Sequence, residues 1–232
     1  MKAREEIRAL ANKEIAENSL RFFKTGKGEY GYGDIFLGVR VPKIRLIAKK
    51  HIDISIIDMK TLIQSKYHEE RLLGLIILVN KYSKTKDRKI KDQLYKIYIS
   101  SFKYINGWDL VDVTCPHIIG EHLRDKDRSI LYTWAKSDDI WTKRIAIVST
   151  HCFIRKNDLE DTFKIAEILL QDKHDLIHKA VGWMLREAGK RDIKKEEAFL
   201  KKYYKIMPRT MLRYSIEKFP EDKRQKYLKG TI

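Results

Sequence analysis

The sequence is poor in cysteine, proline and glycine. It has two cysteines, four prolines and eleven glycines among 232 residues. The two cysteines, Cys115 and Cys152, form no Cys-x-x-Cys pair, which excludes a disulfide framework and fits a reducing, intracellular compartment. Few residues that break helices are present, and apolar residues recur at three- and four-residue steps through most of the chain. The sequence therefore predicts helices and little strand.

Long apolar segments are also missing. The longest run, LLGLIILV at residues 72–79, is far too short to cross a bilayer. The opening residues, MKAREEIRAL, lack the apolar segment of a signal peptide. We therefore expect no membrane insertion and a cytoplasmic location, associated with the nucleoid if the protein is bacterial.

One short stretch suggests a nucleotide site. Residues 26–31 read G-K-G-E-Y-G, which matches the G-x-G-x-x-G pattern. That pattern binds dinucleotides only between a strand and a helix. The residues before it have helical spacing, glycines and Pro42 follow it, and the chain has no G-K-[ST] triplet. We predict a loop between helices that binds no nucleotide, and we expect no cofactor.

No metal site is expected either. His174 and His178 are four residues apart, but no third ligand stands near them in the sequence. Cys115 and His117 are separated by Pro116, which makes a shared thiol–histidine geometry unfavourable.

Positive charge is abundant. The formal net charge is +17, which favours a polyanionic partner and most simply nucleic acid. A basic protein without such a partner is the alternative that composition leaves open.

The helical pattern repeats. Arg71, Asp109, Arg144 and Lys179 occupy equivalent positions in four similar segments, at intervals of 38, 35 and 35 residues. Such a period, with two helices per unit, is typical of an α-solenoid of HEAT or armadillo type. We predict one all-α domain over residues 1–232, built of HEAT-like helical repeats with a concave basic groove. Helices are expected over residues 2–22, 43–51, 55–65, 68–83, 88–104, 108–122, 128–137, 140–156, 160–171, 174–190, 194–205, 208–218 and 221–228.

Three of these segments pair tryptophan with charge. Trp108 and Asp112 are four residues apart and share one helix face, as do Trp183 and the basic Lys179 and Arg186. A tryptophan at helical spacing is usually packed in a core. We expect that for Trp141, which stands next to Lys143 and Arg144. For Trp108, packing in the core and a place in a functional site are equally favoured. For Trp183, the polar helix face around it favours a functional site.

These motifs resemble the AlkD family of DNA alkylation repair glycosylases. The resemblance spans nearly the whole chain and rests on the following segments in order: FFKTGKGEYGYGDIFLGVRVPKIR, YHEERLLGL, NGWDLVD, WTKRIAIV, HKAVGWMLREAGKRD and MPRTMLRYSIEKFP. It implies a HEAT-like fold and hydrolysis of the N-glycosidic bond of cationic alkylpurines such as 3-methyladenine and 7-methylguanine. Its implied partner is double-stranded DNA with alkylated bases, bound by a monomer without a cofactor.

The resemblance also assigns residues. Trp108, Asp112 and Trp183 match the residues that surround the deoxyribose of the damaged nucleotide. The expected DNA-binding residues are Phe22, Lys143, Arg144, Lys179, Arg186 and Arg213. Phe22 departs from the family pattern, because a tyrosine follows the arginine of the early helix in a characterised relative. A non-catalytic solenoid that binds nucleic acid or an acidic protein remains the alternative function.

Overall fold

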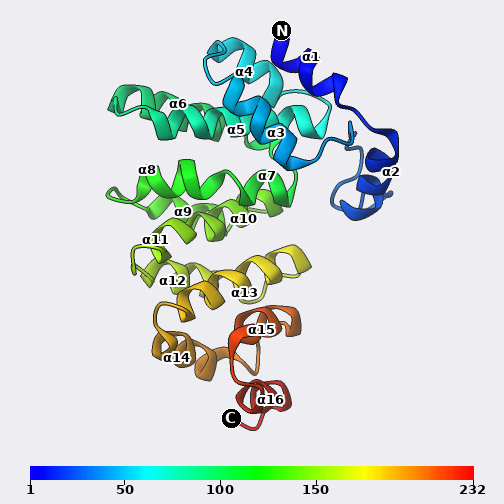
Figure 1. The fold of residues 1–232 in the computed structure, drawn as a ribbon. Helices are drawn as coiled ribbons and strands as arrows, with labels where there is room; N and C mark the ends of the chain where they lie inside the picture. The colour runs from blue at the N-terminus through cyan, green and yellow to red at the C-terminus, as the bar shows by residue number, and fades with distance from the viewer. The chain divides into compact units, whose positions relative to one another are not determined.

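Every regular element of the computed structural model, which describes residues 1–232, is a helix (Figure 1). The only strand-like pairing is an isolated parallel bridge between Ile35 and Tyr67. Packing joins helices that are close in the sequence, such as α4 with α5, α9 with α10, and α13 with α15. The predicted all-α solenoid class is therefore confirmed. None of the helices combines the length and the apolar character that a membrane span requires.

The chain divides into two compact units, residues 1–114 and residues 115–232. The first unit contains α1 (Lys2–Ala9), α2 (Lys13–Phe22), α3 (Val41–Lys50), α4 (Ile56–Ile63), α5 (His68–Lys84), α6 (Arg88–Ser100), the 3₁₀ helix η1 (Phe102–Tyr104) and α7 (Trp108–Asp112). Its core includes apolar side chains of α3, α4 and α5 that are almost completely buried.

The second unit has the same helical character. It contains the π-helical turn η2 (Pro116–Gly120), α8 (Glu121–Leu123), α9 (Ser129–Ala135), α10 (Ile140–Ser149), α11 (His151–Ile154), α12 (Glu160–Ile168), α13 (Asp175–Gly189), α14 (Ile193–Tyr203), α15 (Arg209–Ser215), η3 (Ile216–Lys218) and α16 (Glu221–Lys229). The long helix α13 is central to it, because α10, α12, α14 and α15 all pack against α13.

The helix expected over residues 2–22 is in fact two helices. Asn12 separates them, because its side chain caps α2 by accepting a hydrogen bond from the amide of Ile15 at 3.0 Å. The Asn12 amide donates instead to the carbonyl of Leu37 at 2.9 Å. Tertiary contact with the following loop thus ends α1 and redirects α2.

The helix expected over residues 108–122 is also interrupted. Helix α7 ends at Asp112, after about one and a half turns. The side chain of Thr114 donates to the carbonyl of Leu110 at 2.5 Å, and Pro116 has no amide hydrogen to continue the helical ladder. The prediction of one continuous helix over residues 108–122 was therefore wrong, and Pro116 is the sequence signal against it.

The glycine-rich stretch lies in the loop of residues 23–40, as predicted, with no strand before it. Two of its glycines are required by close approach to the two ends of α2. A Cβ on Gly31 would lie 2.4 Å from the carbonyl oxygen of Phe23. Gly38 has φ +79°, and a Cβ there would lie 2.0 Å from the carbonyl oxygen of Asn12. These glycines therefore let the loop fold closely back onto the start and the end of α2.

Candidate functional site

Four consecutive polar residues at the start of α5 are buried. They are His68, Glu69, Glu70 and Arg71, and all four make side-chain hydrogen bonds. Glu69 accepts from the backbone amides of Leu37, Gly38 and Val39 at 2.8, 2.8 and 3.2 Å. Glu70 accepts from Arg4 and Arg8 of α1 and from Ser65. The start of α5 thereby holds α1 and the 23–40 loop in place.

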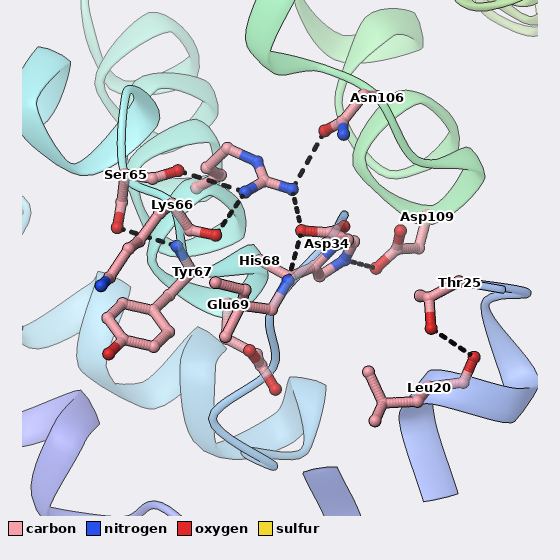
Figure 2. A network of polar contacts seen from close by, with 12 residues as sticks. Leu20, Thr25, Asp34, Ser65, Lys66, Tyr67, His68, Glu69, Asn106 and Asp109 are labelled. Atoms are coloured by element: carbon pink, nitrogen blue, oxygen red, sulfur yellow. Dashed lines mark hydrogen bonds and ion pairs between the residues drawn. The ribbon is translucent and has the colours of Figure 1, made fainter. Parts of the chain in front are cut away.

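His68 stands between two carboxylates (Figure 2). Its Nδ1 lies 2.7 Å from Oδ2 of Asp34, and its Nε2 lies 2.8 Å from Oδ2 of Asp109. Asp34 comes from the loop and Asp109 from α7, so one imidazole ring connects the loop, α5 and α7. Only 2% of His68 is exposed. The second oxygen of Asp109, Oδ1, is buried without a hydrogen-bond partner.

Arg71 completes this network. Its guanidinium donates to Oδ1 of Asp34 at 2.7 Å and to Oδ1 of Asn106 at 3.0 Å, and it also donates to the carbonyls of Ser65 and Lys66 (Figure 2). Two cations, His68 and Arg71, then face two carboxylates. Opposite charges in equal number are what allow such groups to be buried.

The charges of the network perturb one another. Burial favours the neutral imidazole of His68, but the charge of Asp109 and hydrogen bonds to Asp109 and Asp34 outweigh burial and raise the pKa of His68 to about 9. Burial likewise favours neutral Asp34, yet the hydrogen bond from His68 and the charge of Arg71 hold the pKa of Asp34 below its ordinary value. His68 is therefore a buried imidazolium at neutral pH.

Aromatic rings cover the network. Phe23 stacks on Trp108 with a centroid distance of 5.4 Å and an interplanar angle of 18°. Phe22 meets Trp108 edge to face at 5.7 Å and is 65% exposed. Phe36 stacks on His68 at 4.7 Å. These rings line a cavity of about 410 Å³ that also reaches His68, Glu69 and Asp109.

Helix α7 presents the residues that the sequence singled out. Trp108 begins the helix, is partly exposed and lines the cavity, while Asp112 ends it and is also partly exposed. Trp108 is thus not fully buried, and its place in a functional site stays a prediction. An aromatic surface next to carboxylates suits a flat, positively charged group.

The other predicted residues belong to the second unit. Trp183 is a partly exposed residue of α13, and its ring lies 5.7 Å from that of His151. Lys179 pairs with Asp175 at 2.7 Å, and Arg186 pairs with Glu217. Lys143 pairs with Asp172 at 2.5 Å. Trp141 is buried, as expected.

Two of the predicted DNA-binding arginines differ in exposure. Arg213 on α15 is exposed. Arg144 is only 5% exposed and donates to the carbonyl of Leu176 at 2.5 Å. Arg71 and Asp109, which are equivalent to Arg144 in the repeat, are buried too. Arg144 was expected to bind DNA in the concave basic groove; at these three equivalent positions the charge is instead buried and hydrogen-bonded between elements of the fold.

Sequence reasoning missed the network itself. Asp34 and His68 were not selected, and Arg71 and Asp109 were noted only as equivalent positions of the repeat. The available signal was the run His-Glu-Glu-Arg directly before an apolar stretch, on a helix whose next residues are all buried. A polar run that is continuous with a buried one indicates paired charges.

The fold and the site define an all-helical repeat protein with an aromatic cavity over a buried ion network. A family model described as DNA alkylation repair enzyme matches residues 3–219. The chain belongs to this family, whose name supports a role in DNA alkylation repair. It is similar in fold to a solved structure described as a predicted DNA alkylation repair enzyme from Enterococcus faecalis. The TM-score is 0.72 at 14% identity, over 91% of this chain and 97% of that one. No curated protein matches the chain.

Proposed function

We propose that the protein is a DNA glycosylase that hydrolyses the N-glycosidic bond of cationic alkylated purines, such as 3-methyladenine and 7-methylguanine, in double-stranded DNA. The observation that carries the proposal is helix α7, where Trp108 lines an aromatic cavity and Asp112 follows one turn later. Membership of the alkylation repair family supports it.

The chemistry needs few groups from the protein. Alkylation at N3 or N7 makes the purine cationic and a good leaving group, so no strong general acid is required. As the bond breaks, positive charge grows on the sugar, as in other glycoside hydrolyses. The carboxylate of Asp112 stabilises that charge and orients the attacking water. The face of Trp108 adds a cation–π attraction of about 0.5–2 kcal/mol.

The remaining residues have proposed roles in binding. Phe22 has no hydroxyl, so its exposed ring contacts DNA only through apolar and stacking surface. In the second unit, Arg213 and Lys179 are proposed to contact phosphates, and Trp183 keeps the sugar-facing role that the family resemblance implies. The net charge of +17 supports a polyanionic substrate.

The test is the substitution Asp112→Asn. It retains the shape of the side chain and removes the negative charge that faces the developing sugar cation. We expect single-turnover release of 7-methylguanine from methylated duplex DNA to fall by about 10²–10³-fold, while DNA affinity and the thermal unfolding midpoint stay near wild type.

Asp53→Asn is the matched control, because Asp53 is an exposed carboxylate of the same unit. It should release base at the wild-type rate. An aspartate that only stabilised the helix would tolerate asparagine well, so wild-type release by Asp112→Asn would favour the non-catalytic, DNA-binding alternative. Absence of release by the wild-type protein would contradict the proposed reaction directly.

A further inference from the structure

The hydrogen bonds of His68 require one more proton than a neutral ring carries. Both ring nitrogens face carboxylate oxygens, at 2.7 and 2.8 Å, and an ionised carboxylate only accepts hydrogen bonds. A neutral imidazole would place one nitrogen lone pair against an oxygen lone pair. With both carboxylates ionised, the two bonds exist together only when both nitrogens carry hydrogen, as they do in the imidazolium.

The charged groups that pair with this ring come from two other elements, Asp34 from the 23–40 loop and Asp109 from α7. Arg71, on α5 itself, pairs in turn with Asp34. Phe23, which directly follows α2, contributes an aromatic ring whose centroid lies 4.9 Å from that of the His68 ring. Phe23 stacks in turn on Trp108, so rings in contact connect His68 to the candidate site.

Helix α7 depends on such external contacts. It has five residues, its N-cap is Gly107, and no side chain caps its start. A helix this short has too few internal hydrogen bonds to be stable by itself. The bond from His68 to Asp109, together with packing on α5, therefore helps to set where α7 lies. Trp108 and Asp112 are the first and last residues of α7, so the position of this helix also sets theirs.

We propose that His68 is a positioning residue for the glycosylase reaction: held as an imidazolium between Asp34 and Asp109, it fixes α7 and thereby the orientation of Trp108 and Asp112. The expected effect on the reaction rate rests on the proposed function. His68 does not touch the substrate, and we expect the rate of base excision to fall when the His68 ring loses its second proton. That loss is expected near pH 9, because the paired carboxylates raise the pKa of His68 to about this value.

The first experiment is an NMR titration of the wild-type protein labelled with ¹⁵N. At pH 7.5 both ring nitrogens of His68 should give the chemical shift of protonated nitrogen. The indole N–H resonance of Trp108 should then move with the same midpoint as the ring when the pH is raised. A ring that titrates near the ordinary value of 6.5, or a Trp108 resonance that does not follow it, would overturn the inference.

The second experiment compares pH–rate profiles for single-turnover release of 7-methylguanine, with release from DNA alone subtracted. Asp109→Asn keeps an oxygen that accepts from His68 but removes one charge, so the alkaline decline should move down by at least one pH unit. At pH 8.5 the variant should retain about a quarter of its rate at pH 6.5 or less, whereas the wild-type protein should retain about three quarters. The exposed control Asp53→Asn should follow the wild-type profile. A wild-type profile for Asp109→Asn would refute the role of His68.

The outcomes separate the two proposals. If the wild-type protein releases no base at any pH, the proposed function fails, and the Trp108 resonance still decides whether His68 positions α7. If Asp109→Asn does not fold, the wild-type titration and its pH–rate profile decide the question together. An alkaline decline that coincides with the His68 midpoint supports the inference, and a rate unchanged through that midpoint contradicts it.

Discussion

His68 in the first unit and Glu196 in the second are both 2% exposed, but their hydrogen bonding is opposite. His68 has a carboxylate at each nitrogen. Glu196, on α14, has a buried Oε1 without a partner, and its Oε2 lies so close to α13 that a Cβ on Gly189 would meet it at 1.6 Å. Burial and the charge of Glu197 raise the pKa of Glu196 to about 8.

The comparison separates two consequences of burying an ionisable group. Where partners are available, as for His68, the charged form persists and connects elements of the fold. Where they are missing, as for Glu196, the group keeps its proton at neutral pH and contributes little beyond volume. The paired network lies beside the candidate site, whereas Glu196 packs against α13. This contrast leads to three predictions, given from the largest expected effect to the smallest.

Breaking the paired network should cost the most. Asp34→Ala removes the carboxylate that accepts from both His68 and Arg71, so two buried cations are left with Asp109 alone. Removing one partner of a buried ion network typically costs about 3–5 kcal/mol, and we expect that loss in urea unfolding at pH 7. Asp53→Ala, on the surface, should stay within about 0.5 kcal/mol of wild type. A loss for Asp34→Ala as small as that of the control would show that the network is not a source of stability.

Relieving the unpaired carboxylate should have the opposite sign. The pKa of Glu196 in the folded protein is about 8, above the ordinary value of 4.5. Its contribution to stability is thus fully present below pH 4.5 and is lost as the pH rises through 8. Glu196→Gln cannot ionise, so at pH 8 it should be more stable than wild type by about 1–3 kcal/mol in urea unfolding.

The pH dependence separates this effect from a packing effect. At about pH 3 the advantage of Glu196→Gln should disappear, because that pH is well below 4.5 and Glu196 is protonated in both the folded and the unfolded protein. An equal gain at both pH values would mean that packing, not ionisation, is responsible. The free energy of unfolding of the variant should still fall by up to about 3 kcal/mol between pH 6.5 and 9. His68 has a raised pKa, so the stability that its protonated form provides is lost in that window.

Exposed pairs of the second unit should matter least for stability. Lys179 pairs with Asp175 one turn earlier on α13, and both side chains are partly exposed. Lys179→Gln should cost only about 0.3–0.5 kcal/mol of stability. If Lys179 also contacts a phosphate, the slope of log affinity for DNA against log salt should fall by about one.

Lys164→Gln is the matched control for Lys179. Lys164 forms the same kind of i,i+4 pair, with Glu160 on α12, and is not a proposed DNA contact. It should change stability similarly and leave the salt slope unchanged. Equal salt slopes for the two variants, measured by fluorescence anisotropy with duplex DNA, would remove Lys179 from the proposed interface.

The sequence alone was sufficient for the helical class, because apolar spacing and scarce proline are local properties. It also selected Trp108 and Asp112, since residues four apart on one short helix share a face whatever surrounds them. It predicted the 23–40 loop from glycines that interrupt the helical pattern. The sequence motifs also identified the family: the resemblance to DNA alkylation repair proteins agrees with the family model that matches residues 3–219.

Tertiary structure decided where the charges lie. Asp34 and Asp109 are 34 and 41 residues from His68, so no local pattern relates the three side chains, and only packing of the loop, α5 and α7 brings them within 2.8 Å. Tertiary structure also divided residues 2–22 at Asn12, whose amide donates to Leu37 of the loop. Helical spacing depends on neighbours a few residues apart, whereas burial and pairing of charge depend on segments that the chain brings together only when it folds.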